Sequence, residues 1–425
     1  TTDGSAANPS ACACGSVDCE TAGTTGMHCR SDLGRCFRTP APRKWIRKEI
    51  SIRPTAFSQG RAESGFGGAV FCSASKSSTK QHKQTVPLAG TIGTSCGSKA
   101  IVMEERPGAE LVSACYEKGM SLNTGTEVSL SIAMQGGALA ASLCDVYLDG
   151  VAMNSNRAEA TGGSVELLKG ATITVRGETR FYNNSAKKKG GAVSCVECES
   201  IELRNGTTFW RNHAGTRGGA VAVEAALADD DGMMMDSHGS MFVRNTAGMD
   251  GGAVAVSFES NERVAVWRST SDEFSNNTAD TGAGGAIYAV GTRVEMWNGT
   301  ICSGNKALRG GGGGIMWEPR APNVASPRWS ECEPFRDENS RVNINEAEYG
   351  DDLATQTKTL RIMSAGDGKF RVRAADQRFV EAPRVVALDH YGHVITSENL
   401  DDLAVVADLK ETSSSAELAG ATIAN

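Results

Sequence analysis

The chain has 425 residues, of which 49 are glycine and only 6% are aromatic, and it carries a net charge of −7 at pH 7. An acidic chain without a basic stripe cannot displace the counterions of nucleic acid, which excludes nucleic acid as a partner. No apolar run approaches the ~20 residues that a membrane-spanning helix needs, so we predict no membrane span in this chain.

The first 45 residues are rich in cysteine. Five of the 13 cysteines lie there among glycine, serine and threonine: Cys12, Cys14, Cys19, Cys29 and Cys36. So short a segment cannot bury a hydrophobic core, and we interpret residues 1–45 as a module held by disulfides in an oxidising compartment. A zinc site is the alternative, although the segment lacks the paired Cys-x-x-Cys spacing that structural zinc sites use.

A repeated phrase dominates residues 46–360. A large apolar residue is followed by an asparagine, then by an alanine and a glycine pair. Four clear copies and a fifth, starting at Ile301, are present. The residues of the four clear copies are Phe181, Asn184, Gly190 and Gly191; Phe209, Asn212, Gly218 and Gly219; Phe242, Asn245, Gly251 and Gly252; and Phe274, Asn277, Gly284 and Gly285. Weaker copies begin at Phe57, Met153 and Val342.

The phrase predicts stacked strands. The distance from phenylalanine to the glycine pair is almost constant, whereas the distance between copies varies, as expected of a solenoid that accepts insertions on one face. The apolar segments are short and β-branched, and each glycine would cost about 1 kcal/mol in a helix. We therefore predict a parallel β-helix of about ten coils. Its phenylalanines stack, its asparagines form a ladder, and its glycines allow positive φ at a tight turn.

Phe-x-x-Asn followed by Gly-Gly-Ala resembles the paired motif of the polymorphic outer membrane protein repeats. These repeats are best known from chlamydial surface adhesins and also occur in large surface proteins of algae and protists. The resemblance covers about residues 50 to 355 and implies a right-handed β-helix displayed at a cell surface.

Further residues support an extracellular or cell-surface location for a secreted protein. Cys195 and Cys198 follow a glycine pair, and we interpret them as a local disulfide rather than a redox dithiol. Four asparagines stand in Asn-x-Ser/Thr sequences and are candidates for N-glycosylation in a eukaryote: Asn183, Asn205, Asn276 and Asn298. The chain has neither a starting methionine nor a signal peptide, so we expect a mature or internal piece of a longer protein.

The repeat stops near residue 361. The alternating segments around Asp389-His-Tyr-Gly-His393, and those from Thr412 onward, resemble the opening of an immunoglobulin-like domain of the filamin, cadherin or invasin kind. We assign residues 361–425 to a partial domain of that type.

Catalytic chemistry finds little support in the residues. Asp229, Asp230 and Asp231 form the only acidic cluster on a repeat. The simpler interpretation of this cluster is a solvated loop, and the more specific alternative is a Ca²⁺ site. Lys187-Lys-Lys189 is interpreted as a solvated corner, with binding of an anionic glycan as the alternative. The histidines have no serine or cysteine partner that would complete a triad.

Two functions remain. The first is a non-catalytic extracellular rod that acts as an adhesin, as a spacer or as the structural subunit of a filament. Its partners would be surface or matrix proteins, copies of itself, or glycans, and it needs no cofactor. The second is a β-helix protein that binds carbohydrate or degrades polysaccharide.

Overall fold

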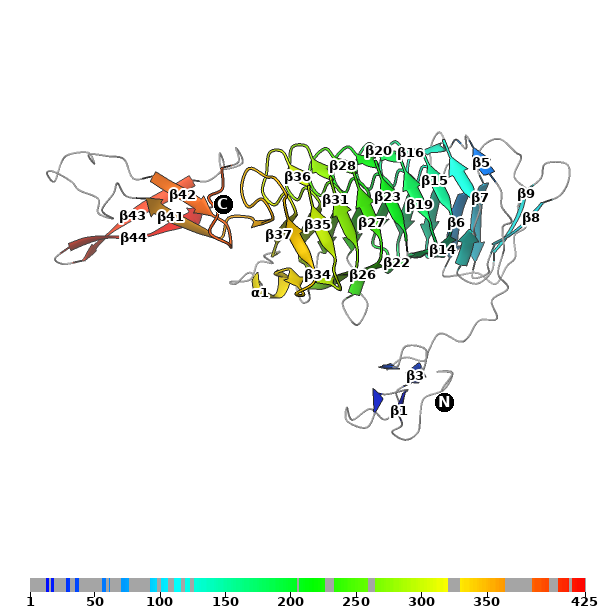
Figure 1. Cartoon of the computed structure of the whole chain (residues 1–425), viewed down its shortest axis with the longest axis horizontal. Helices are drawn as coiled ribbons and strands as arrows, with labels where there is room; N and C mark the ends of the chain where they lie inside the picture. Colours follow the sequence, from blue (N-terminus) through cyan, green and yellow to red (C-terminus); the bar gives the residue numbers. More distant parts are fainter. Residues whose placement is uncertain are drawn as a thin grey trace. The chain divides into compact units, whose positions relative to one another are not determined.

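The computed structural model describes residues 126–204, 206–225, 233–258, 264–319, 329–363 and 384–396, together with Arg61 and the backbone of those strands named below that lie outside these ranges. Contacts between residues divide the chain into two units, Thr1–Glu49 and Ile50–Asn425. The second unit contains four parallel sheets whose strands are stacked coil upon coil (Figure 1). The predicted parallel β-helix is confirmed.

The solenoid strands recur in sets of four, and each set gives one strand to each sheet. Seven complete sets follow one another from β10 to β37, and further strands extend the sheets at both ends. Sheet 1 contains β10 (Gly119–Leu122), β14 (Asp145–Asp149), β18 (Thr172–Arg176), β22 (Ser200–Arg204), β26 (Met233–His238), β30 (Ala265–Thr270), β34 (Thr292–Trp297) and β38 (Phe335–Arg336). Sheet 2 contains β5 (Ala56–Ser58), β11 (Glu127–Ser129), β15 (Ala152–Asn154), β19 (Arg180–Tyr182), β23 (Thr208–Trp210), β27 (Met241–Val243), β31 (Glu273–Ser275), β35 (Ile301–Ser303) and β39 (Arg341–Asn343).

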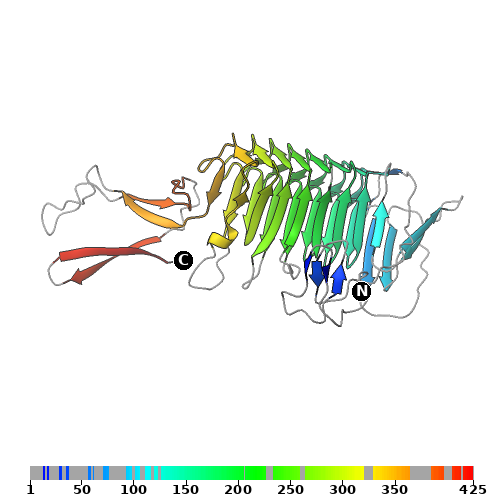
Figure 2. The same cartoon turned by 60° about the horizontal axis from the view of Figure 1, so that its bottom comes forward.

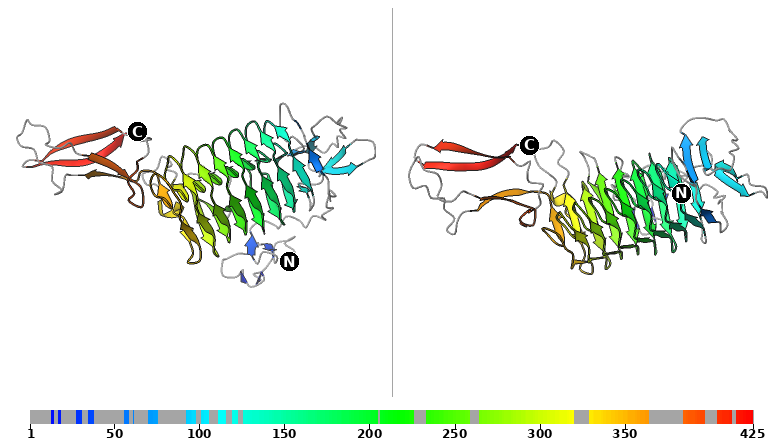
Figure 3. Two further views of the ribbon diagram at one scale, coloured as in Figure 1. Left: turned by 45° about the horizontal axis from the view of Figure 1, so that its top comes forward. Right: turned by 90° about the horizontal axis from the view of Figure 1, so that it is seen from above.

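The other two sheets complete each coil. Sheet 3 has two-residue strands: β12 (Ile132–Ala133), β16 (Arg157–Ala158), β20 (Ser185–Ala186), β24 (His213–Ala214), β28 (Thr246–Ala247), β32 (Thr278–Ala279) and β36 (Lys306–Ala307). Sheet 4 contains β7 (Ile92–Gly97), β6 (Val70–Ser75), β13 (Leu139–Ser142), β17 (Val165–Leu168), β21 (Val193–Val196), β25 (Val221–Ala225), β29 (Val254–Phe258), β33 (Ile287–Val290), β37 (Ile315–Glu318) and β40 (Leu353–Thr355). The regular stacking of the sets is visible from further directions in Figure 2 and Figure 3.

Burial follows the two-residue period of a strand, and one sheet departs from it. In β18 of sheet 1, buried and partly exposed residues alternate, which is the pattern of a sheet with one face in the core. In β21 of sheet 4, Val193, Ser194 and Cys195 are all buried. Sheet 4 is therefore covered on its outer face as well as its inner one.

The predicted phenylalanines stack inside the coil. The ring centroids of Phe181 and Phe209 are 4.7 Å apart, those of Phe209 and Phe242 are 4.8 Å apart, and those of Phe242 and Phe274 are 4.7 Å apart. These distances equal the spacing between hydrogen-bonded strands, so identical rings in register keep contact from coil to coil.

The predicted start of the fifth copy of the repeat, Ile301, is one residue out of register with the structure. Ile301 pairs with Glu273 and is 42% exposed, whereas Cys302 pairs with Phe274 and is fully buried. Cys302, not Ile301, fills the phenylalanine position. The prediction was wrong because it chose the larger apolar side chain, while a one-residue shift moves a side chain to the other face of a strand.

Short antiparallel pairs lie outside the solenoid sheets. They are β1 (Ala13–Cys14) with β2 (Val17–Asp18), β3 (His28–Arg30) with β4 (Arg35–Phe37), β8 (Ile101–Glu105) with β9 (Leu111–Cys115), β41 (Thr359–Met363) with β42 (Arg384–Leu388), and β43 (Ala404–Thr412) with β44 (Ser415–Ala424). A one-turn helix, α1 (Trp329–Cys332), precedes β38. The immunoglobulin-like domain and the domain boundaries stay predictions.

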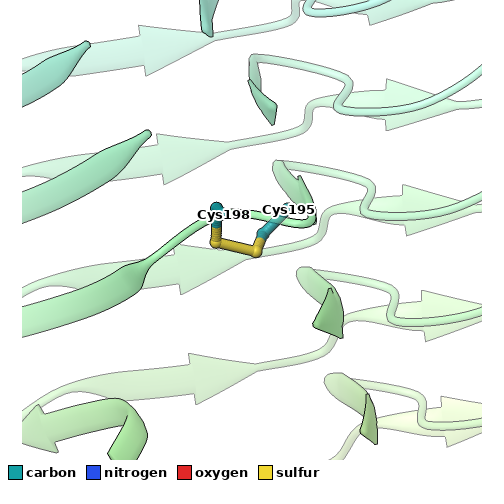
Figure 4. The surroundings of a disulfide bond; sticks show 2 residues. All are labelled: Cys195 and Cys198. Atoms are coloured by element: carbon teal, nitrogen blue, oxygen red, sulfur yellow. A yellow bond between two sulfur atoms is a disulfide. The ribbon is translucent and has the colours of Figure 1, made fainter. Parts of the chain in front are cut away.

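Two of the predicted disulfide cysteines lie on sheet 4 and just after it. Cys195 and Cys198 form a disulfide that spans the end of β21 (Figure 4). Both residues are buried in the core cluster. Of the N-terminal cysteines, Cys29 and Cys36 lie opposite each other in the β3–β4 pair. Cys14 lies on β1, and Cys12 and Cys19 lie outside the described residues. Disulfide bonding in that module remains a prediction.

Candidate functional site

The asparagines of the repeat form one continuous ladder, which we call the asparagine ladder. Asn212 donates from its backbone N and from Nδ2 to Oδ1 of Asn245, both at 3.0 Å, and its Nδ2 also donates to the carbonyl oxygen of Phe181. Its own Oδ1 accepts the same two bonds from Asn184. Every polar atom of the amide is thus used, as burial of an amide requires. The ladder contains Asn156, Asn184, Asn212, Asn245, Asn277, Asn305 and Asn345.

The two glycines of each pair have different tasks. The first has positive φ, as at Gly218 (φ 65°). The second has no room for a side chain, since a Cβ on Gly219 would lie 2.1 Å from the carbonyl oxygen of Gly252 on the next coil. Positive φ was the expected reason for both glycines. For the second, the close approach of two backbones is the reason instead.

A second polar column lies where sheet 1 turns into sheet 2. Hydroxyl groups occupy it in most coils; Thr179 accepts from the backbone N of Val151, and Ser340 from that of Thr300. Asp272 replaces the hydroxyl in one coil and accepts from the hydroxyls of Ser237 and Ser269 and from the backbone N of Ser240. Burial raises the pKa of Asp272 to about 6 despite these donors.

The outer face of sheet 4 is covered by a double column of side chains that we call the lane. One column holds the residue just before each glycine pair, and the other holds the residue five positions later, on the sheet 4 strand. Together they form the pairs Gln135/Ala140, Thr161/Glu166, Lys189/Ser194, Arg217/Ala222, Asp250/Ala255, Ala283/Tyr288, Gly311/Met316 and Tyr349/Ala354. All the strand members are buried.

Within the lane, a large residue in one column faces a small one in the other. Arg217 stands before Ala222, whereas Ala283 stands before Tyr288. At Gly311 the space is taken by a neighbour, because a Cβ there would lie 2.3 Å from the ring of Tyr349. The large side chain of a coil therefore comes from either column, and close packing over the outer face of sheet 4 leaves little room for two large ones in one pair.

Glu166 is the most perturbed acid in the lane. It is fully buried, and among the described residues no donor forms a hydrogen bond to either of its carboxyl oxygens. Burial raises its pKa to about 8, and the polar groups of Thr161 and Ser194 offset only part of that rise. Glu166 is therefore a neutral carboxylic acid at pH 7.

Charged side chains farther along the lane are tied together across coils. Arg217 Nε contacts Asp250 Oδ2 at 2.9 Å, and the Arg217 guanidinium lies 5.5 Å from the ring centroid of Tyr288. The Tyr288 hydroxyl donates to Glu318 at 3.0 Å, and burial raises the pKa of both groups. Lys189 pairs with Glu224 on the following coil. Each tie joins residues of different coils, so the lane holds the stack together.

The C-terminal segment covers the end of the lane. Ala387 and Ile395 form a small hydrophobic cluster with Tyr288, Met316 and Tyr349. Close by, Trp317 Nε1 donates to the hydroxyl of Tyr391 at 3.0 Å. The side chain of Asp389 holds the turn by accepting from the backbone N of Tyr391 and of His393. The turn around Tyr391 thus packs on the last coils.

The lane has few means to act on a substrate. Its two acids are Glu166, which is fully buried, and Asp250, which is buried and paired with Arg217, and its cations are paired with carboxylates. No group of three His, Cys, Asp or Glu residues that could hold a metal ion occurs within the described part of the chain. The three candidate calcium ligands, Asp229, Asp230 and Asp231, lie outside the described residues. The sequence argument missed the lane, although aligning the copies on their glycine pairs would have exposed its paired columns.

The other candidate residues are dispersed. Asn183, Asn276 and Asn298 are exposed and have positive φ, and Asn205 lies outside the described residues. Lys187 pairs with Glu159, while Lys188 is exposed. The lysine run is therefore partly ion-paired rather than uniformly solvated.

Comparison with known families identifies the repeat. Residues 178–196 and 273–290 match the family model of the Chlamydia polymorphic membrane protein repeat. Each match contains one phenylalanine, one ladder asparagine and one glycine pair. The chain therefore carries this repeat, as the motifs predicted. Searches among curated proteins and among solved structures found no match. Among the described residues, no helix is both long and apolar enough to cross a membrane.

Proposed function

We propose that this chain, which carries the polymorphic membrane protein repeat, is a non-catalytic rod displayed at the outer surface of a cell. It acts there as an adhesin or as a structural subunit or spacer of a surface assembly. Its partners are surface or matrix proteins, further copies of the chain, or glycans.

One observation carries the proposal: the repeated polar residues are used to join one coil to the next. All hydrogen-bonding groups of the Asn212 amide are bonded to neighbouring coils. The lane cations, Lys189 and Arg217, form ion pairs with carboxylates of the following coil. Residues that recur in each coil and bond to the next coil extend the solenoid, which supports a rod. An active site instead needs residues that occur in one coil and are absent from the equivalent positions of the others.

The test is adhesion measured together with cleavage. Fluorescent beads coated with the full chain are expected to adhere to cultured cells, or to beads coated with the same chain, above the level of albumin-coated beads. In parallel, the chain is incubated with cell-wall and matrix polysaccharides, with and without Ca²⁺, and new reducing ends are measured. Release of reducing ends would overturn the non-catalytic proposal.

A carbohydrate-binding protein is the second candidate. The observation that favours it is an aromatic pair on the outer side of sheet 2: the ring centroids of the half-buried Tyr182 and the exposed Trp210 are 4.9 Å apart. Retention of the chain on a polysaccharide without cleavage would support this role.

A further inference from the structure

The outer side of sheet 2 and the bend that follows it carry a cluster of four residues, Tyr182, Trp210, Arg211 and Arg244, which we call the arginine cluster. Trp210 is 37% exposed, and both arginines are exposed. Tyr182 precedes Trp210 on the neighbouring strand in direct register. The Arg211 guanidinium carbon lies 4.9 Å from the centre of the Trp210 ring.

The backbone does not account for these arginines. Arg211 and Arg244 occupy the same bend of successive coils, both with φ of 54°. Other coils place Leu130, Ser155, Asn183, Asn276, Gly304 and Ile344 there, so the positive φ of this bend does not select one residue type. The bend therefore does not require arginine, and what matters in these two coils is what the exposed guanidinium groups can contact.

Their charge is uncompensated within the described part of the chain. Arg211 has only its contact with the Trp210 ring, and Arg244 has no ion pair or side-chain hydrogen bond there. Trp210 and Val243 are direct partners in the sheet, so the two arginines that follow them are neighbours of like charge. Like charges on adjacent strands repel. A bound anion would remove that repulsion.

The stacking also prepares Arg211 for an anion. A guanidinium that lies on an aromatic ring uses its face and leaves its N–H edge free for two parallel hydrogen bonds to an oxyanion. Beside that edge, the exposed part of Trp210 offers an apolar surface against which the C–H face of a sugar ring can pack.

We propose that the arginine cluster is a binding site for an acidic polysaccharide. A sulfate group lies between Arg211 and Arg244, and the adjoining sugar ring packs on Trp210. This inference rests on the proposed surface display, which would bring the cluster into contact with such polymers. The chain carries a net charge of −7, so its bulk charge opposes binding of a polyanion and the local cluster must supply the attraction.

The test uses the full chain on immobilised dextran sulfate, with neutral dextran as reference. The double variant Arg211→Asn, Arg244→Gly places in each bend a residue type that other coils already use there, so its fold is retained. Asparagine is avoided at position 244 because it would create an Asn-Asn-Thr sequon. The matched control is Lys169→Asn with Arg309→Asn, which removes two exposed charges elsewhere, and at Lys169 the change also falls on a residue with positive φ.

We expect the double variant to bind dextran sulfate at least tenfold more weakly than the wild type and the control pair to bind within twofold of it. Arg211→Lys keeps the charge but loses the planar fork, and we expect it to bind severalfold more weakly. Wild-type affinity in the double variant, an equal loss in the control, or equal retention on neutral dextran would overturn the inference.

Bead adhesion separates this inference from the proposed function. Beads that adhere to cells although the chain ignores dextran sulfate would overturn the site and leave the surface rod standing. Binding to dextran sulfate by a chain that also cleaves polysaccharide would support the site and overturn the non-catalytic rod.

Discussion

The asparagine ladder and the lane run along the same coils, yet one keeps a single residue type and the other changes at every step. From Asn156 to Asn345 the ladder has an amide in each coil, because Oδ1 of one asparagine accepts from the asparagine of the preceding coil, as that of Asn245 does from Asn212. The lane needs only a filled volume over sheet 4, and either column can supply it. The comparison shows that directional hydrogen bonds require the same residue type in each coil. Packing requires only that one of the two lane columns supplies a large side chain.

The largest expected effect on stability comes from a substitution at a glycine whose backbone is part of the coil that carries both regions. Gly219→Ala places a Cβ 2.1 Å from the Gly252 carbonyl oxygen and 2.5 Å from that of Thr246. Neither backbone atom can give way without moving a coil, so we expect a loss of about 5 kcal/mol or more in the free energy of unfolding. Guanidinium denaturation measures it. Gly299→Ala is the control, with no atom within 4 Å of the new Cβ, and should lose only about 1 kcal/mol to its positive φ.

Next in size is the removal of one ladder amide. Asn212→Ala leaves the buried N–H of Asn184 without an acceptor and the carbonyl of Phe181 without that donor. Unsatisfied buried groups cost about 1–3 kcal/mol each, so we expect a loss of roughly 4 kcal/mol. The exposed Asn343→Ala should stay within about 0.5 kcal/mol of the wild type. Equal losses in both variants would show that the ladder bonds contribute nothing specific.

The lane is tested by pH. The pKa of Glu166 is raised to about 8 in the fold, so folding favours its protonated form, and its contribution is present in acid and is lost as pH rises toward 8. Between pH 5 and pH 7.5 we expect the wild type to lose about 3 kcal/mol relative to Glu166→Gln. Asp272 also has a raised pKa, but it is common to both proteins and cancels in their difference. Parallel stability curves for the two proteins would contradict a buried neutral acid.

The smallest effect tests the exchange of volume between the two lane columns. Ala222→Tyr adds a ring beside Arg217 and should cost about 2 kcal/mol by overpacking. Adding Arg217→Ala copies the natural Ala283/Tyr288 pair and should recover about 1 kcal/mol of that loss, even though the bond to Asp250 disappears. A double-mutant cycle by thermal or chemical denaturation measures the coupling. Additive losses would show that the two columns are independent.

The sequence by itself determined the parts of the structure that contact their own copies. Phe209 stacks on Phe181 and Phe242, and Asn212 bonds to Asn184 and Asn245. Each of these residues contacts the equivalent residue of the neighbouring coil, so the repeat in the sequence is enough to predict both members of the contact. The solenoid and its two inner columns were therefore predictable.

Only the tertiary structure decided the outer face and the exact register. Cys302 rather than Ile301 entered the core because strand pairing, not side-chain size, selects the face. Arg217 lies over the ring of Tyr288, and Arg211 lies beside Arg244, because the coils stack in register. Residues that differ from copy to copy carry no periodic signal, and their contacts exist only once the coils are in register.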